Sequence, residues 1–250
     1  MQQIAAWTNL SETTFFLPPT DPNADYRLRI FTPRNELPFA GHPTLGSAHA
    51  VIQAGLATPK NGTLIQECRA GLIPISVAEI GAVSTLQLEM PTASFTDLTD
   101  DVKARLEGIL GVPLSAPSIV DVGPKWIVAG LKDAQTVTAL TPNFAQMAAL
   151  ESELGVTGVS IYGPYSSGDI AVEVRSFAPS SGIDEDPVCG SGNGSVAAYR
   201  FRNGEFADGA TYQAAQGRCV GRDGKITLKA DNGNIYVGGQ AITTIDGTIT

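Results

Sequence analysis

The chain has 250 residues, which suits one large domain or two small ones, and its net charge of −9 argues against the basic surface that nucleic acids and anionic membranes require. Three cysteines and two histidines, without Cys-x-x-Cys or His-x-x-x-His spacing, argue against a disulfide framework and a closed zinc site. No apolar run reaches the ~18 residues that span a bilayer, and the N-terminus lacks a secretory pattern. We therefore expect a cytoplasmic protein without a nucleic-acid or membrane partner.

In chain order, the predicted elements are mostly short strands. A helix ending at Trp7 precedes Glu12 and an apolar strand. β-Branched runs bounded by Gly, Pro or Asn predict further strands at 26–32, 63–68, 73–78, 85–90, 118–122, 125–128, 159–162, 170–177, 211–215, 225–228, 234–237 and 241–245. Helices are predicted at 44–54, 101–110, 142–154 and 193–202, each followed by a glycine suited to a left-handed C-terminal cap.

One segment of the sequence occurs twice. The first repeat reads Leu28-Arg29-Ile30-Phe31-Thr32-Pro33, then Glu36, then Pro38-Phe39-Ala40-Gly41. The second repeat reads Val174-Arg175-Ser176-Phe177-Ala178-Pro179, then Glu185, then Pro187-Val188-Cys189-Gly190. The second loop is three residues longer, since Arg29 to Gly41 is 12 and Arg175 to Gly190 is 15. Six identities in the same order, each time before a helix of small residues, indicate an internal duplication.

The duplication predicts two similar domains related by a pseudo-two-fold axis, with a boundary near the polar stretch 91–101. Each repeat launches a helix, at Gly41-His42-Pro43 and at Gly190-Ser191-Gly192. The free N–H groups and the positive dipole end of a helix N-terminus attract anions. Two such termini facing each other across a cleft would hold a small carboxylate from both sides.

An acidic run, Asp184-Glu185-Asp186, precedes the second of these helices. For Asp184 and Glu185 we favour a solvated loop that complements the helix dipole. Asp186 differs because Pro187 holds it in an extended conformation that aims its side chain into the turn. It is a candidate for orienting a substrate, with a solvated acid as the alternative.

Glu12 lies between the first helix and an apolar strand. Taken alone, a surface carboxylate is the more common interpretation. Its neighbours are apolar on both sides, however, and a desolvated carboxylate acquires a raised pKa and can exchange protons near neutral pH.

His42 and Cys189 stand beside the two helix-launching glycines. At a helix N-terminus an imidazole is pushed toward its neutral form, so His42 could donate or accept a proton, whereas His49 more plausibly packs or caps. The same dipole is expected to lower the pKa of the Cys189 thiol. Because Ala40 takes the matching place in the first repeat, a two-thiol device is excluded there. Arg29 and Arg175 are expected to bridge sheets or domains rather than bind substrate.

Three blocks of this sequence resemble the signatures of the phenazine biosynthesis PhzF-like isomerase family, which is related to diaminopimelate epimerase and proline racemase. The blocks are Thr8-Asn9-Leu10-Ser11-Glu12-Thr13, Phe39-Ala40-Gly41-His42-Pro43-Thr44 and Glu185-Asp186-Pro187-Val188-Cys189-Gly190-Ser191-Gly192. Gly123-Pro124-Lys125-Trp126, Gln216-Gly217 and Gly221-Arg222-Asp223-Gly224 also resemble stretches conserved in the family.

The resemblance implies an α+β fold of two pseudo-symmetric domains, each a mostly antiparallel sheet around a central helix, with the site in the cleft between them. The domains would comprise 1–97 plus a returning 241–250, and 98–240. The family's activity is isomerisation of a small carboxylate without a cofactor or metal, and its members are typically homodimers. By motif, Glu12 resembles the proton-shuttling carboxylate. His42, Asp186 and Ser191 resemble substrate-contacting and relay groups, and the Gly41 and Gly190 amides resemble carboxylate holders.

The chain departs from the family pattern in two places. Family members usually begin roughly 25 to 30 residues earlier, with an extra strand and an Asn-Pro loop, so we expect either that Met1 is not the true start or that the first sheet lacks a strand. Cys189 sits where the epimerase relatives keep one of two catalytic thiols, and Ala40 replaces the other. Glu12 would therefore complete any acid/base pair.

These observations favour a cofactor-independent isomerase in which Glu12 moves a proton on a small carboxylate held by the helix termini and Asp186. Two alternatives stay open. One is a racemase or epimerase that uses Cys189 with Glu12, and the other is a carboxylate-binding protein without catalysis.

Overall fold

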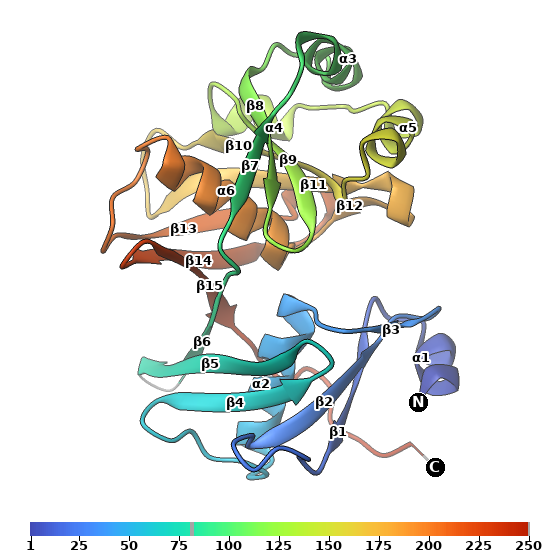
Figure 1. Ribbon diagram of the computed structural model, residues 1–250, viewed down its shortest axis with the longest axis vertical. Coiled ribbons are helices and arrows are strands. Elements are labelled where there is room, and N and C mark those ends of the chain that lie inside the picture. The colour runs from blue at the N-terminus through green and yellow to red at the C-terminus, as the bar shows by residue number, and fades with distance from the viewer. Residues whose placement is uncertain (81–82, 250) are drawn as a thin grey trace. The chain divides into compact units, whose positions relative to one another are not determined.

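The computed structural model describes residues 1–80 and 83–249, and its backbone divides into two compact units (Figure 1). The first unit comprises Met1–Glu89 together with the C-terminal segment from Gly238, and the second comprises Met90–Val237. The boundaries predicted at 97/98 and 240/241 lie eight and three residues beyond these.

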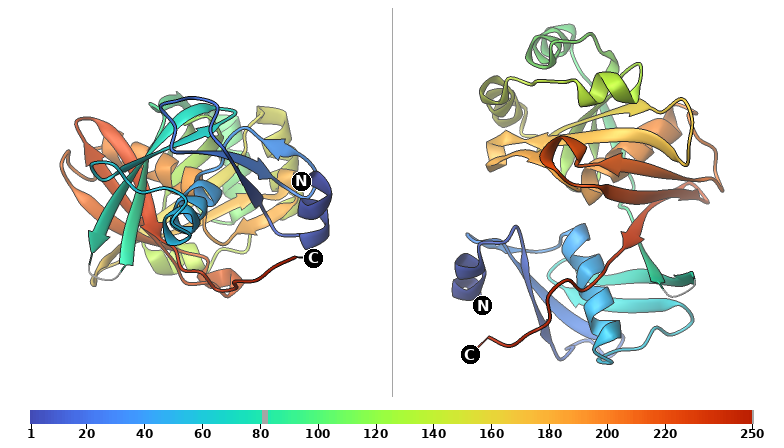
Figure 2. Two further views of the ribbon diagram at one scale, coloured as in Figure 1. Left: turned by 90° about the horizontal axis from the view of Figure 1, so that it is seen from below. Right: turned by 180° about the vertical axis from the view of Figure 1, so that it is seen from behind.

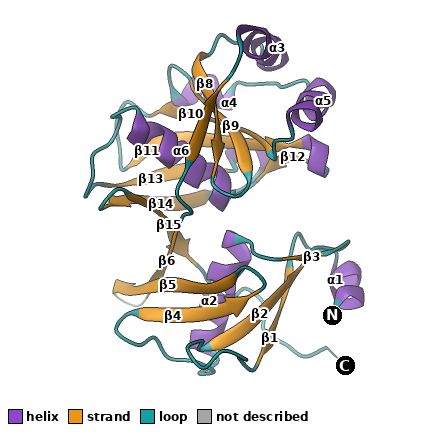
Figure 3. Cartoon of the chain, viewed as in Figure 1, coloured by secondary structure: helices purple, strands orange, loops and turns teal. Residues whose placement is uncertain are grey.

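The first unit is a sheet with one long helix (Figure 3). Its elements are α1 (Gln2–Thr8), β1 (Thr13–Leu17), β2 (Tyr26–Phe31), β3 (Glu36–Leu37), α2 (Gly41–Gln53), β4 (Thr63–Cys68), β5 (Gly71–Ile80) and β6 (Val83–Glu89). The strand order is β1-β2-β4-β5-β6, with β3 paired to β2. Leu28 and Ile30 on β2 alternate with half-buried residues, so that one face of the strand packs against α2 in the core.

The second unit has a longer sheet and more helices. Its elements are β7 (Ser94–Asp97), α3 (Asp100–Leu110), β8 (Ser115–Asp121), β9 (Lys125–Gly130), α4 (Ala134–Thr138), α5 (Phe144–Leu154), β10 (Gly158–Pro164), β11 (Ile170–Ala178), β12 (Ile183–Asp186), α6 (Gly190–Arg202), β13 (Thr211–Gln216), β14 (Gly224–Asp231) and β15 (Asn234–Gln240). The strand order is β15-β14-β13-β11-β10-β9-β8-β7, with β12 paired to β11.

This sheet is covered on both faces. Along β9, Trp126 and Val128 belong to the core that packs against α6, whereas Ile127 and Ala129 belong to the core that packs against α3 and α5. Successive strand residues point to opposite faces, so this alternation places α6 on one side and the other helices on the opposite side (Figure 2). Strand β10 is accordingly buried along nearly its whole length.

The internal duplication is confirmed by the topology. In the first unit β1 pairs antiparallel with β2, the chain forms β3 and α2, and β4 then pairs parallel with β2. In the second unit β10 pairs antiparallel with β11, the chain forms β12 and α6, and β13 then pairs parallel with β11. Both launched helices, α2 and α6, have 13 residues. Most of the remaining strand pairs are antiparallel, as predicted.

The four predicted helices and most predicted strands are confirmed, and Gly111 and Gly155 form left-handed caps. The predicted strand 241–245 is wrong, because this segment has no strand and Ile242 and Ile245 are exposed. It is held instead by Thr243, which hydrogen-bonds Gln53 and lies 3.3 Å from Nε2 of His49. The sequence predicts a loop at the acidic run 184–186, since acidic residues have little strand propensity. The structure instead forms strand β12 there, paired to β11.

Candidate active site

In the first repeat, the arginine and the acid that both repeats share bind each other. Arg29 donates from Nε and Nη2 to the two carboxylate oxygens of Glu36, at 2.8 and 2.9 Å, and so links β2 to β3. The hydrogen bonds from Arg29 lower the pKa of Glu36 below its ordinary value. The guanidinium also lies over the ring of Phe31, 5.0 Å from its centre. The pair fixes the strand that leads into α2.

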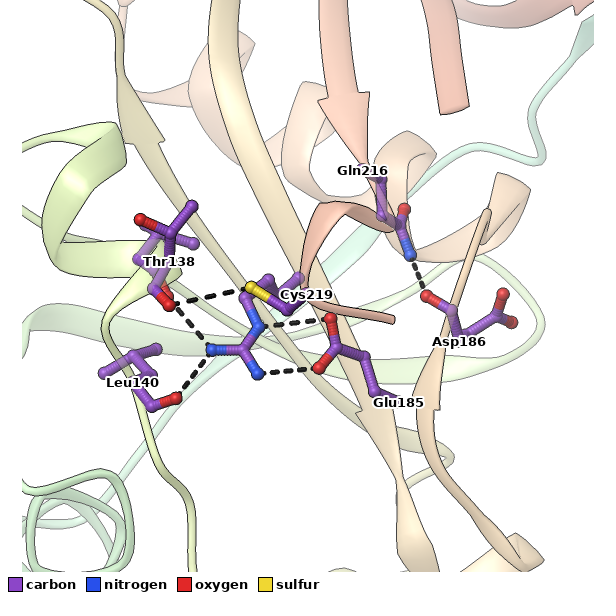
Figure 4. A network of polar contacts seen from close by, with 8 residues as sticks. Thr138, Leu140, Glu185, Asp186, Gln216 and Cys219 are labelled. Atoms are coloured by element: carbon purple, nitrogen blue, oxygen red, sulfur yellow. Dashed lines mark hydrogen bonds and ion pairs between the residues drawn. The ribbon is translucent and has the colours of Figure 1, made fainter. Parts of the chain in front are cut away.

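The second repeat reproduces this arrangement in a buried setting. Arg175 donates from Nε and Nη2 to Glu185 at 3.1 and 2.6 Å, and it lies 4.9 Å from the ring centre of Phe177. Its Nη1 also donates to the carbonyls of Val137 and Leu140. Figure 4 shows the Leu140 carbonyl and the Glu185 carboxylate on opposite sides of this network.

The expectation that Glu185 is solvated is therefore wrong. Its side chain is only 5% exposed, because the partner guanidinium compensates for the burial of its charge. The two arginines bridge neighbouring strands of one sheet, and neither pairing leaves its own unit.

Downstream of Glu185 the chain forms a tight turn, residues 186–193, which we call the α6 turn. The half-buried Asp186 accepts a hydrogen bond from the backbone N–H of Val188 at 2.9 Å through Oδ1. The turn packs closely on the end of β13, since a Cβ on Gly217 would lie 2.4 Å from the carbonyl oxygen of Pro187. Only glycine fits there, both for space and because its φ is +94°.

Cys189 caps α6 instead of presenting a reactive thiolate. Its Sγ accepts a hydrogen bond from the N–H of Gly192 at 3.2 Å, and the residue is buried. Burial, followed by the nearby carboxylate of Asp186, raises the pKa of this thiol to about 12. The expectation of a lowered pKa is wrong, because desolvation outweighs the effect of the helix terminus.

The N-terminus of α6 leaves two backbone donors for a ligand. The first N–H groups of a helix have no acceptor within it. Here the N–H of Cys189 is accepted by Oε1 of Gln216 and that of Gly192 by the Cys189 thiol. Among the residues that the structure describes, no acceptor is found for the N–H groups of Gly190 and Ser191.

The N-terminus of α2 also has two backbone N–H groups without an acceptor, but for a different reason. Its third residue, Pro43, has no N–H to satisfy, and the N-cap residue Ala40 makes no side-chain cap. For the N–H groups of Gly41 and His42, no acceptor is found within residues 1–80 and 83–249. In both repeats, the first and second residues of the helix thus keep their donors.

The hydroxyl of Ser191 is oriented by a neighbouring indole. Nε1 of Trp126, which is 3% exposed, donates to Oγ of Ser191 at 3.1 Å. An indole N–H is only a donor, so Ser191 must accept this bond and its own hydroxyl hydrogen stays available. Within the turn, Sγ of Cys189 lies 3.7 Å from Oγ of Ser191, a distance at which the two groups can share a weak hydrogen bond. Ser191 can therefore donate to an anion near the helix terminus.

The remaining candidates lie in the first unit. Glu12 is half-buried and directly precedes β1, as the sequence predicted, while His42 is the exposed second residue of α2. Strand β1 and α2 are joined by a hydrogen bond from Ser47 to Thr14, 3.0 Å between the hydroxyl oxygens. The structure thus gathers Asp186, Cys189, Gly190 and Ser191 into one turn, and it places Glu12, Gly41 and His42 on neighbouring elements of the other unit.

Sequence reasoning assigned no role to two residues of this site, Gln216 and Trp126. Both lie in stretches that resemble the family, and both are buried polar side chains that bond the α6 turn. The available signal was the position of Gln216 at a strand end before a glycine.

Within the described residues, no group of three or more His, Cys, Asp or Glu side chains could hold a metal ion. None of the helices in that part of the chain has the length and hydrophobicity of a membrane-spanning segment.

Comparison with known proteins defines the class. The sequence profile of the family described as phenazine biosynthesis-like protein matches residues 1–247. A crystal structure of a PhzF-family phenazine biosynthesis protein from Bacillus anthracis superposes with a TM-score of 0.82 at 23% identity, over 95% of this chain and 84% of that one. The chain therefore belongs to the phenazine biosynthesis-like (PhzF) family, with the α+β fold expected.

Two curated relatives are similar over almost the whole chain. Antisense-enhancing sequence 1 of Schizosaccharomyces pombe is 40% identical, covering 99% of this chain and 87% of the relative. A trans-2,3-dihydro-3-hydroxyanthranilate isomerase of Pseudomonas chlororaphis is 32% identical, covering 100% of this chain and 87% of the relative. Membership in this family makes the protein an enzyme of the isomerase type.

Proposed function

We propose that this isomerase moves a proton between two positions of a small carboxylate substrate. The observation that carries the proposal is the pair of backbone donors, Gly190 and Ser191, that the α6 turn leaves without a protein acceptor among the described residues. Two N–H groups at the positive end of a 13-residue helix match the two oxygens of a carboxylate.

Glu12 is proposed as the group that transfers the proton. A carboxylate can abstract a proton from a carbon next to, or conjugated with, the substrate carboxyl group and return it elsewhere on the same molecule. The half-burial of Glu12 beside the apolar strand β1 supports this role. His42 and Asp186 would contact the substrate and relay protons, and the Gly41 amide would act as a further anion donor.

The name of one group of relatives supports a substrate class. Trans-2,3-dihydro-3-hydroxyanthranilate carries a carboxylate, an amino group and a ring with double bonds that can shift. We propose an unsaturated amino carboxylate of this kind as the substrate. Such a shift neither oxidises nor reduces the molecule, so we propose that it requires no cofactor. We further propose that the enzyme acts as a homodimer in the cytoplasm, which light scattering and fractionation would test.

A mechanism with Cys189 as the second acid or base has less support. A thiol whose pKa is raised to about 12 is protonated at neutral pH, and its sulfur already accepts a hydrogen bond from Gly192. Forming the thiolate would place a charge in this buried environment beside the carboxylate of Asp186, and the hydrogen bond from Gly192 offsets only part of that cost. Glu12 is left as the better proton acceptor.

The test is isotope exchange. The protein is incubated in D2O with trans-2,3-dihydro-3-hydroxyanthranilate, and ¹H NMR follows product formation and deuterium at each carbon. Wild type should turn over, the Glu12→Gln variant should lose turnover while still binding the carboxylate, and Cys189→Ser should retain most of the rate. Full activity in the Glu12→Gln variant would contradict the assignment.

A further inference from the structure

We propose that Gln216 is the positioning residue of this site, holding the α6 turn so that the Gly190 and Ser191 amides point at the substrate carboxylate. The inference rests on the proposed function, because it assigns those amides to substrate binding. Gln216 is not proposed to touch the substrate; it acts through the turn.

The side-chain amide of Gln216 bonds the turn at three points. Nε2 donates to the carbonyl oxygen of Asp186 at 2.6 Å, as Figure 4 shows. Oε1 accepts from the backbone N–H of Cys189 at 3.2 Å and from Nδ2 of Asn193 at 2.6 Å. Gln216 itself is 1% exposed at the end of β13. One planar group thus ties the last residue of β12, the helix cap and the first turn of α6 to a single strand.

These bonds select which donors remain for a ligand. By accepting the Cys189 N–H, Gln216 removes the donor that directly precedes Gly190 and Ser191. By holding the Asp186 carbonyl, it fixes the main chain from which the candidate Asp186 carboxylate projects. Because the Cys189 N–H is already paired, the adjacent donors of Gly190 and Ser191 remain for a ligand. Preorganised donors of this kind bind developing charge without reorganisation.

The first repeat shows what a less connected glutamine does. Gln66 on β4 is equally buried, and its Nε2 donates to Oγ1 of Thr44, which corresponds to Asn193 in the repeat. Its Oε1 accepts from the hydroxyl of Tyr26. No bond from Gln66 to the main chain that precedes α2 is found among the described residues. In both repeats a buried glutamine bonds a side chain in the first turn of the helix. Of these two glutamines, only Gln216 has bonds to the main chain before its helix among the described residues.

The donor and the acceptor of Gln216 are both required. A glutamate at this position would keep the acceptor but place a carboxylate oxygen against the carbonyl of Asp186, since an ionised acid cannot donate. A methionine would keep the approximate volume and lose all three bonds. The two variants therefore separate the effect of the bond to the Asp186 carbonyl from that of the bond to the Cys189 N–H.

The experiment compares wild type, Gln216→Met, Gln216→Glu and the matched control Gln66→Met. Backbone ¹H–¹⁵N spectra would record the shifts of Gly190 and Ser191 and the exchange protection of the Cys189 amide, with and without anthranilate as probe. We expect Gln216→Met to shift both signals, to lose the Cys189 protection and to weaken anthranilate binding about tenfold, the effect of roughly one lost hydrogen bond. Gln66→Met should leave these three amides unchanged.

Kinetics supply the second readout. With a substrate that turns over, Gln216→Met should raise KM about tenfold, while the pH dependence of kcat, set by Glu12, stays as in wild type. Unchanged Gly190 and Ser191 shifts and unchanged Cys189 protection in Gln216→Met would overturn the proposal; if that variant does not fold, unchanged shifts in Gln216→Glu would do so. If wild type shows no turnover but Gln216→Met still moves these amides, the proposed function fails and the positioning role stands.

Discussion

The two repeats use the same residues in the same order, yet they bury them to different depths. The side chains of Arg29 and Glu36 are 36% and 17% exposed, whereas those of Arg175 and Glu185 are 6% and 5% exposed. Each arginine lies over the phenylalanine two residues later. The shared motif therefore gives the same Arg–Glu pairing in both units. The contribution of that pair to the free energy of unfolding should differ, because the two pairs are buried to different depths.

The difference comes from what covers each pair. In the second unit the carbonyls of Val137 and Leu140, at the end of α4, accept from Arg175 and exclude water from it. A buried charge that loses its partner is costly, whereas an exposed ion pair contributes little. The second repeat should therefore be the more rigid of the two.

The largest expected effect is the loss of the buried pair. Replacing Glu185 by Gln leaves the Arg175 charge buried without compensation, and the free energy of unfolding should fall by about 3–5 kcal/mol. The matched change Glu36→Gln should cost about 1 kcal/mol or less. Urea unfolding monitored by circular dichroism measures both. Equal losses would show that burial does not distinguish the repeats.

A smaller effect is expected from the helix glycines. A Cβ at Gly192 would lie 2.6 and 2.7 Å from the hydroxyl oxygens of Ser176 and Ser160, which are buried and bond each other at 2.9 Å. Gly192→Ala should therefore lower stability by about 1–3 kcal/mol. Gly46, inside α2, has no such neighbour within 4 Å, so Gly46→Ala should raise stability by about 0.5–1 kcal/mol. A tolerated Gly192→Ala would contradict this close packing.

The caps of the two helices should respond differently. Cys189→Ala removes the acceptor for the Gly192 N–H and should cost about 1 kcal/mol, while Cys189→Ser keeps an acceptor and should cost less. Adding a hydroxyl in the first repeat, by Ala40→Ser, should gain less than a full cap, because Pro43 supplies no N–H at the third position and only the His42 N–H is left to bond the new hydroxyl. Thermal unfolding measures all three variants. A full cap's gain in Ala40→Ser would show that the His42 N–H binds the new hydroxyl as strongly as a normally capped donor does.

The last effect concerns pH, and it is absent at neutral pH. Because the pKa of Cys189 is raised to about 12 from its ordinary 9.0, the neutral thiol favours the folded state below pH 9. This contribution is lost as pH rises from about 9 to about 12, so stability should fall in that window. Iodoacetamide followed by mass spectrometry should modify Cys189 more slowly than the exposed Cys219 at pH 8. Rapid modification of Cys189 would contradict the assigned environment.

The sequence predicts the fold well where local pattern and global topology agree. The alternating strands, the glycine caps and the repeat are all readable because each depends on residues close together in the chain. The strand predicted at 241–245 fails because β-branched residues there have no neighbouring strand to pack against, so propensity alone does not form an element.

The candidate site is predictable only in part. Comparing the repeats points to Gly41, Gly190 and their neighbours, but it does not reveal that Glu185 pairs with Arg175 rather than with water. Nor does it reveal that burial would reverse the effect of the helix on Cys189. Both depend on contacts between residues distant in sequence, as does the role of Gln216, which lies 23 residues from Asn193.

In both repeats the first two N–H donors of the launched helix have no acceptor among the described residues, and we propose that they bind a substrate carboxylate. Titration of ¹⁵N-labelled wild type with anthranilate tests this directly, because each backbone amide reports separately. We expect saturable shifts of the Gly41, His42, Gly190 and Ser191 amides, with smaller changes at Cys189 and Gly192, whose N–H groups already have acceptors. Shifts at Cys189 and Gly192 without shifts at Gly190 and Ser191 would contradict it.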